Sequence, residues 1–226
     1  MQKKFSLLGI DLGGCMSGSS AYVYTEADAT GITIVEAFKE PRHKDHEACL
    51  EFLVDACTKR PLDAIAIDAP LSLPAALTDP DFKQLRREGS GEILNPYLYR
   101  YTDYCLFERF GLRPMPPAGD RIGRLTARCA ALRHRLGYRF PHIRLLGRDV
   151  PLYEVYPKQI AQRLELGAYK KEPEQLFKRL NVSLPHHDEH LLDALLCVYG
   201  AHRILTGHTE PPPEGIAAEG WCFPVL

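Results

Sequence analysis

The sequence lacks several features that would assign it to a specialised class of protein. It contains no apolar run close to the roughly 20 residues that a bilayer-spanning helix needs, and its first residues do not form the basic and apolar pattern of a secretory signal. We therefore expect a cytoplasmic protein with no membrane partner. No two of its seven cysteines are spaced as CxxC, which gives no indication of a disulfide framework or a thiolate zinc site. The formal net charge is only −1, so the average charge does not suggest a nucleic-acid partner.

The composition is that of an ordinary folded protein. Of the 226 residues, 45% are hydrophobic and 25% are charged, which is enough to build a sizeable core. Short apolar stretches rich in β-forming residues predict strands, and apolar residues at helical spacing predict helices. The predicted strands cover residues 5–11, 19–24, 31–38, 62–68 and 150–156, and the predicted helices cover 43–59, 158–166, 173–180 and 189–206.

A long segment interrupts this pattern at residues 75–141. It is rich in arginine, proline and glycine, and it contains helix-like pieces at 80–88, 97–110 and 120–136. We interpret it as a helical insertion. The first three strands are joined by short links and are expected to be antiparallel neighbours, whereas the fourth follows a helix and is expected to run parallel to the first. The sequence therefore predicts a single α/β domain over residues 1–226, with a mixed sheet flanked by helices.

Three carboxylates stand at or near the ends of predicted strands. Asp11 follows FSLLGI, Asp68 follows AIAI, and Glu154 lies within LYEVYP. If Asp11 and Asp68 lie on adjacent strands, two like charges only a few ångströms apart would repel unless a divalent cation neutralised them. Ligation by oxygen alone favours Mg²⁺ or Mn²⁺. For any one of these residues the alternative is a loop-capping role, but the set favours a metal site.

A further acid and a histidine lie near the start of the last predicted helix. Asp188 and Glu189 have the placement of ordinary N-terminal capping and first-turn acids. Asp193 lies past the first turn beside an apolar stripe, where capping no longer explains it. His190 is three positions earlier, so the two side chains share one helix face.

Five short motifs occur in a characteristic order along the chain. They are GIDLGG at 9–14, AIDAPLSLP at 66–74, RYTD at 100–103, EVYP at 154–157 and HLLDALLCVYGAHR at 190–203. This combination resembles the DUF429 family, described as predicted nucleases with a ribonuclease H-like fold. The last motif also resembles the last-helix motif of the RuvC-type junction resolvases. The resemblance implies an acidic site built from Asp11, Asp68, Glu154 and Asp193.

Phosphodiester hydrolysis would give these residues distinct roles. Two metals about 4 Å apart activate a water on one side of the phosphorus and stabilise the leaving oxygen on the other. We expect Asp11 to bridge the metals, and Asp68 and Asp193 to hold one each. Glu154 or His190 would orient water or carry a proton. Glu154 is alternatively a supporting group that does not touch the metals.

The segment from Arg100 to Asp149 holds eleven arginines, four acidic residues and no lysine, which gives a local charge of +7. Arginine binds phosphate in a planar, bidentate manner, so this segment is a candidate surface for DNA or RNA. The alternatives are a solvated helix face and, for Arg100 with Asp103, a structural ion pair. The four residues that we select as candidate nucleic-acid ligands are Arg100, Arg121, Arg124 and Arg128.

Two other functions remain open at this stage. GIDLGG followed by serines resembles the first phosphate loop of actin-like sugar kinases, although 226 residues hardly leave room for their second domain. A binding module without catalytic activity is the other alternative. We favour a metal-dependent nuclease, because a chain without that activity would have little reason to keep several costly buried acids.

Overall fold

The computed structural model describes residues 3–14, 17–79, 91–184, 186, 188–216 and 219–226, except for the side chains of Asp120 and Arg121. The predicted helical piece over 80–88 lies outside the described residues. No helix in the described part of the chain is long and apolar enough to cross a membrane.

A six-stranded sheet, in the order β3-β2-β1-β4-β6-β5, forms the centre of the molecule. The first three strands form the expected antiparallel meander, and β4 and β6 run parallel to β1. This is the topology of a ribonuclease H-like sheet with one added edge strand, so the predicted fold class is confirmed. The strands are β1 (Phe5–Asp11), β2 (Ala21–Asp28), β3 (Gly31–Lys39), β4 (Ala64–Asp68), β5 (His142–Leu145) and β6 (Arg148–Glu154).

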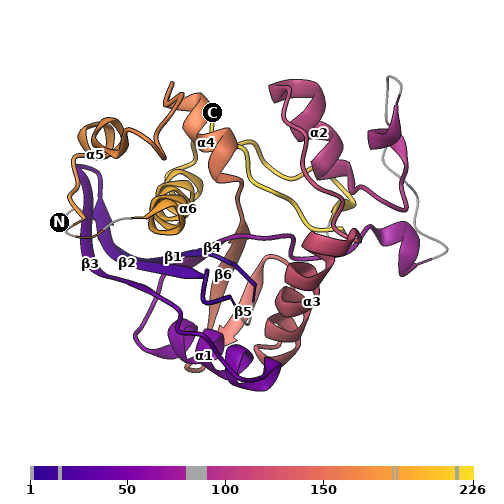
Figure 1. Ribbon diagram of the computed structural model, residues 1–226, viewed down its shortest axis with the longest axis horizontal. Helices are drawn as coiled ribbons and strands as arrows, with labels where there is room; N and C mark the ends of the chain where they lie inside the picture. The colour runs from indigo at the N-terminus through magenta and orange to yellow at the C-terminus, as the bar shows by residue number, and fades with distance from the viewer. Residues whose placement is uncertain (1–2, 15–16, 80–90, 185, 187, 217–218) are drawn as a thin grey trace.

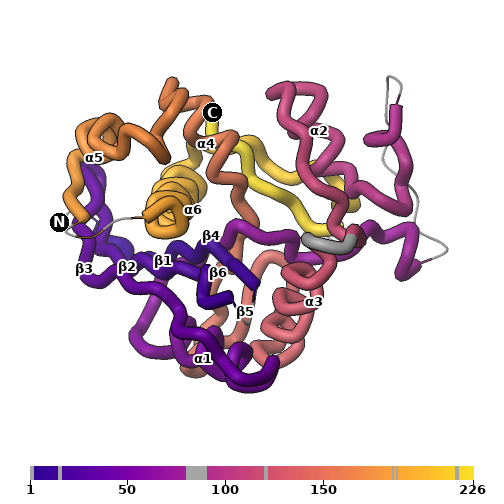
Figure 2. Tube along the Cα trace, viewed as in Figure 1, coloured from indigo at the N-terminus to yellow at the C-terminus, as the bar shows by residue number. Residues whose placement is uncertain are grey.

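Helices cover both faces of the sheet (Figure 1). The helices α1 and α3 pack on one face, and α4, α5 and α6 pack on the other, while α2 lies beside the C-terminal segment (Figure 2). The helices are α1 (His46–Thr58), α2 (Tyr101–Phe110), α3 (Asp120–Arg135), α4 (Pro157–Arg163), α5 (Pro173–Leu180) and α6 (Glu189–Leu205), with 3₁₀ turns at Ala75–Leu77 and Glu92–Leu94.

Strand alternation divides the core into two layers. Leu7 is buried in the layer beneath α6, whereas its neighbour Leu8 is buried in the layer beneath α1 and α3. The contact of α6 with β1 is especially close at Gly9, where an added Cβ would lie 2.1 Å from the carbonyl oxygen of Ala194. Only glycine permits this approach, and it brings the side chains of α6 next to the end of β1.

The strand β5 was not expected from the sequence. It has only four residues and pairs antiparallel with β6 through a turn at Leu146 and Gly147. Both turn residues have positive φ values, 49° and 79°, as a tight two-residue hairpin requires. The hairpin begins one residue after the predicted insertion ends.

Candidate metal centre

Two of the predicted site residues meet at the carboxyl ends of neighbouring parallel strands. Asp11 is the last residue of β1 and Asp68 is the last residue of β4, and the two are directly paired in the register of the sheet. The expectation that they lie on adjacent strands is confirmed. Because parallel strands end at the same edge, both carboxylates emerge at one place on the molecule.

The third carboxylate, Asp193, comes from α6. One carboxylate oxygen from each of Asp11, Asp68 and Asp193 can be chosen so that all three atoms lie within 4.8 Å of one another. Asp11 and Asp193 are buried, and Asp68 is partly buried. The close packing of α6 at Gly9 explains how a helix residue reaches the ends of two strands. We refer to these three residues as the aspartate cluster.

The aspartate cluster is electrostatically crowded. Burial raises the pKa of Asp11, and the nearby charge of Asp193 raises it further, against the lowering effect of a hydrogen bond from His190. Burial also raises the pKa of Asp68 well above its usual value, and the charges of Asp11 and Asp193 add to this effect. A cation at the cluster would relieve this repulsion.

Two residues that sequence reasoning missed hold Asp193 in place. The Tyr169 hydroxyl donates to one oxygen of Asp193 and the Lys170 ammonium donates to the other, both at 2.5 Å. Burial lowers the pKa of Lys170, but the hydrogen bond and charge of Asp193 outweigh it and leave that pKa raised. Both residues lie in the link between α4 and α5, where no spacing or motif indicates a role.

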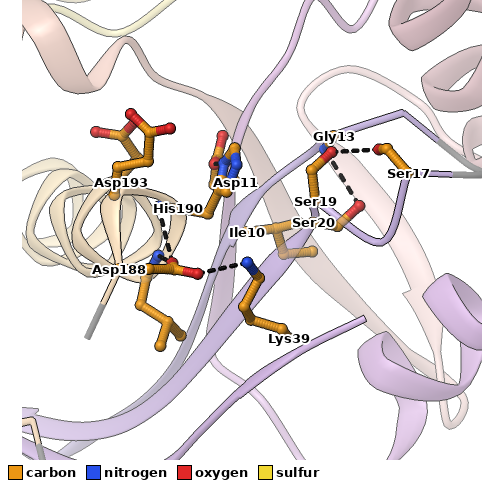
Figure 3. Close-up of polar contacts among 12 residues, drawn as sticks. Ile10, Asp11, Gly13, Ser17, Ser19, Ser20, Lys39, Asp188, His190 and Asp193 are labelled. Atoms are coloured by element: carbon orange, nitrogen blue, oxygen red, sulfur yellow. Dashed lines mark hydrogen bonds and ion pairs between the residues drawn. The ribbon is translucent and has the colours of Figure 1, made fainter. Parts of the chain in front are cut away.

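His190 contacts Asp11, which also lies close to it in Figure 3. Its Nδ1 lies 2.7 Å from Asp11 Oδ2, and Nδ1 is the donor when Asp11 is ionised, because an ionised carboxylate can only accept. This hydrogen bond raises the pKa of His190. The backbone that carries His190 is fixed because Asp188, the N-cap of α6, accepts from the backbone N–H groups of His190 and Leu191. Asp188 is also paired with Lys39 (Figure 3).

Glu154 lies outside the aspartate cluster. Its two oxygens accept hydrogen bonds from Arg100 at 2.6 and 2.7 Å, and Oε2 also accepts from the backbone N–H of Leu71. These three bonds use most of the acceptor positions of the carboxylate and hold it against Arg100. The geometry therefore gives Glu154 a structural ion pair in place of the predicted role in orienting water or carrying a proton.

Two of the four predicted nucleic-acid ligands are buried. Arg100 is 1% exposed and pairs with Asp103 as well as Glu154, so the structural alternative raised for it is correct. Arg128 is 7% exposed and is enclosed by the acceptors of Glu40, Ser20 and two backbone carbonyls. Neither guanidinium is available to a phosphate, which corrects the prediction for both.

The other two predicted nucleic-acid ligands are Arg121 and Arg124, and neither is shown to be buried. Arg124 is exposed on α3, and its neighbours Ile122 and Leu125 line a hollow that also contains Asp11 and Asp68. The side chain of Arg121 lies outside the described residues.

Two hollows meet at the aspartate cluster. The larger has a volume of about 960 Å³ and is bordered by Asp68, Asp193 and residues of the link between α4 and α5. Three lysines line it, namely Lys158, Lys170 and Lys171. The smaller hollow, about 180 Å³, contains Asp11 and Asp68 and is bordered by Arg100 and Glu154. Asp68 lines both.

The donor set of the aspartate cluster fits a hard divalent cation. All three side chains offer oxygen, which suits Mg²⁺ or Mn²⁺ better than zinc. Their crowding and raised pKa values are the physical conditions that a divalent charge would relieve. The Lys170 ammonium is a cation already beside Asp193, so a bound metal ion would share that carboxylate with it.

Comparisons with known proteins give one family match. A sequence model of a family described as "Protein of unknown function (DUF429)" matches residues 9–217. No curated protein matches the chain. Among solved structures, Thermus thermophilus RuvC has 13% sequence identity and a TM-score of 0.44, over 92% of this chain and 99% of that one. T. thermophilus RuvC in complex with a Holliday junction substrate has 14% identity and a TM-score of 0.42, over 90% and 96%.

Proposed function

The chain belongs to the DUF429 family, whose function is unknown, and we propose that it is a metal-dependent nuclease that hydrolyses phosphodiester bonds of nucleic acid. The observation that carries this proposal is the aspartate cluster, in which three carboxylates converge beside an open cleft. The buried carboxylate of Glu154, by contrast, has its negative charge balanced by an ion pair with Arg100. The aspartate cluster instead gathers more negative charge than its own cations offset, which is the pattern of a cation site.

We assign the ligands as follows. Asp11 would bridge two Mg²⁺ or Mn²⁺ ions, and Asp68 and Asp193 would hold one each. When bound, the ions supply an activated water and stabilise the charge on the leaving oxygen. His190 fixes the orientation of Asp11 through the bond from Nδ1. Tyr169 and Lys170 fix Asp193 in the same manner.

The cleft of about 960 Å³ offers a path for the nucleic-acid backbone. Lys158, Lys170 and Lys171 place positive charge along it, and Asp68 and Asp193 lie at its border. A phosphate held by these ammonium groups would be close to the aspartate cluster. On the side of α3, the neighbours of the exposed Arg124, Ile122 and Leu125, border the second approach. These contacts would bind the backbone, so they carry little information on base sequence or on DNA against RNA.

The test is cleavage of labelled single-stranded, duplex, RNA/DNA hybrid and branched substrates in Mn²⁺, Mg²⁺ or EDTA. We expect the wild-type protein to cut at least one of them when a metal is present and none in EDTA. Asp68→Asn keeps the size of the side chain and removes its charge, so it should lower the rate by more than about 100-fold, the upper end of the loss seen when a supporting group of a metal ligand is removed.

The matched control is Asp149→Asn, which makes the same change at an exposed residue of β6 paired only with Arg144 among the residues described. It should cleave at the wild-type rate. Cleavage that resists EDTA, or that Asp68→Asn retains in full, would contradict the assignment of the site. Binding of the panel without cleavage under either metal would replace the nuclease with a binding module.

A further inference from the structure

A second group of metal-binding side chains lies on the other face of the sheet from α6. Glu40 directly follows β3, His43 lies in the link to α1, and Cys49 lies in the second turn of α1. One ligand atom from each can be chosen so that all three atoms lie within 4.8 Å of one another. The Glu40 side chain is fully buried, Cys49 is fully buried, and the His43 side chain is 13% exposed.

Two atoms of this group are buried without a hydrogen-bond partner among the described residues. They are Oε2 of Glu40 and Nε2 of His43. The His43 nitrogen lies 3.3 Å from the other oxygen of Glu40, but the two do not form a hydrogen bond. Leaving a buried polar atom unpaired destabilises the fold, because the atom has lost its hydrogen bonds to water. A carboxylate oxygen and an imidazole nitrogen that converge beside a thiol would each recover this cost by coordinating one cation.

We propose that Glu40, His43 and Cys49 bind a transition-metal ion, with zinc as the best match. The donors are one oxygen, one nitrogen and one sulfur, a mixed set that zinc accepts and that Mg²⁺ does not favour. The carboxylate and the thiolate would offset two of the three positive charges that the ion and Arg128 bring together. Three protein donors leave one tetrahedral position for water or another ligand.

Arg128 supports this group from α3. Its Nη2 donates to Oε1 of Glu40 at 2.5 Å and to the backbone carbonyl of Cys49 at 3.1 Å. Glu40 would therefore bridge the guanidinium and the ion, one oxygen to each, as carboxylates around metal sites commonly do. Nη1 of Arg128 donates to Ser20 and to the carbonyl of Gly13, in the loop after β1. The ion would join the end of β3 to α1, and Arg128 would connect this group to α3 and to the loop that follows Asp11.

The proposed zinc site is independent of the nuclease proposal, and its test does not need activity. The full chain, freed of metal with a chelator, would be titrated with Co²⁺ and followed by near-ultraviolet absorption, where a thiolate bound to cobalt gives a charge-transfer band. We expect saturation at one equivalent and loss of the band when Zn²⁺ is added. Cys49→Ser and His43→Asn should weaken binding by more than about 10-fold, the lower end of the loss expected from supporting groups alone.

Two controls separate this site from other cysteines and from the aspartate cluster. Cys57→Ser changes a second fully buried thiol of α1 and should keep the band. Asp68→Asn should also keep it. Absence of a thiolate band in the wild-type protein, or a band that survives Cys49→Ser, would overturn the proposal.

A measurement on the wild-type protein covers the case in which a variant does not fold. X-ray absorption of the zinc-loaded chain should show one sulfur at about 2.3 Å and the remaining ligands, nitrogen or oxygen, at about 2.0–2.2 Å. A shell of oxygen and nitrogen without sulfur would place the ion elsewhere and would refute the site.

Discussion

Buried charge in this protein falls into two groups of residues with opposite energetics. Arg100 is enclosed by Asp103 and Glu154, and every oxygen of the two carboxylates accepts a hydrogen bond from it. The aspartate cluster has three carboxylates, and among the described residues its basic hydrogen-bond partners are Lys170 and His190. The first group stabilises a fold through complete pairing. The second is costly without a further cation, which is why we assign function to it and not to Glu154.

The Arg100 ion-pair network gives a test of this distinction. Arg100→Met keeps much of the side-chain volume but leaves two buried carboxylates without their cation. We expect it to lower the free energy of unfolding by about 3–5 kcal/mol, measured by urea denaturation at neutral pH. Arg124→Met makes the same change at an exposed residue of α3 and should shift stability by less than about 0.5 kcal/mol. Equal effects of the two substitutions would refute the structural role of Arg100.

The sequence identifies the acids of the site better than it identifies their partners. Asp11 and Asp68 can be predicted because each ends an apolar strand, and strand ends meet at one edge of a parallel pair. Arg128 could not be placed, because its acceptor Glu40 lies 88 residues away and local composition does not show which way an arginine points. The ion pair of Glu154 with Arg100 joins residues 54 positions apart, and the sequence could not predict it for the same reason.

Secondary-structure elements show where pattern reasoning succeeds and where it stops. The strands β1, β4 and β6 carry continuous apolar runs, and α6 carries a long apolar stripe, so their presence is evident from the sequence. The strand β5 has four residues and only two buried positions, which is too short for a periodic signal. Similarly, α3 is predicted as a helix, but its position against α1 depends on Cys129 and Leu132 packing in the layer beneath both helices.

The two ends of α3 are expected to differ in nucleic-acid binding. Arg124 lies in the first turns of the helix, beside the hollow that contains Asp68. Arg144 is an exposed arginine of β5 that lies near the other end of α3, because its backbone N–H donates to the carbonyl of Leu136, just past that end. The helix α3 has 16 residues, so it is about 24 Å long. Arg124→Ala should weaken binding and reduce the slope of log K against log salt by about 0.7–0.9, the value for one phosphate contact.

Fluorescence anisotropy with a labelled oligonucleotide over a range of salt concentrations would measure that slope. Arg144→Ala is the control and should leave the slope unchanged. An unchanged slope for Arg124→Ala would show that this arginine belongs to a solvated helix face and does not contact phosphate. The lysines of the larger cleft would then be the remaining candidates for binding the nucleic-acid backbone.

For the whole molecule, the aspartate cluster links stability to pH. The pKa values of Asp11 and Asp68 are raised in the folded protein, so protonation of these groups favours folding. This contribution is fully present below the unfolded value of 3.8 and is lost as the pH rises through the raised folded values. The pKa of His190 is also raised, so its contribution is likewise lost as the pH rises through that value. The stability that these three groups give the metal-free protein should therefore fall between acidic and mildly alkaline pH, whereas the lowered pKa values of Asp188 and His202 act in the opposite direction.

Asp68→Asn should make the protein more stable than the wild type without metal and less stable than the wild type when metal is added. In EDTA at pH 8 the variant lacks one of the repelling charges, so its melting temperature should exceed that of the wild-type protein by about 2–4 °C for each kcal/mol of repulsion removed. The excess should shrink toward pH 4, where protonation neutralises the wild-type carboxyl as well.

Mn²⁺ at about 100 times its dissociation constant stabilises a folded binding site by about 2.7 kcal/mol, which should raise the wild-type melting temperature by about 5–11 °C. The variant has lost a ligand and should gain little. Differential scanning fluorimetry of both proteins at the two pH values, with and without Mn²⁺, measures all of these shifts. A variant that gains as much from Mn²⁺ as the wild-type protein would remove Asp68 from the metal site, even if the nuclease assay found no substrate.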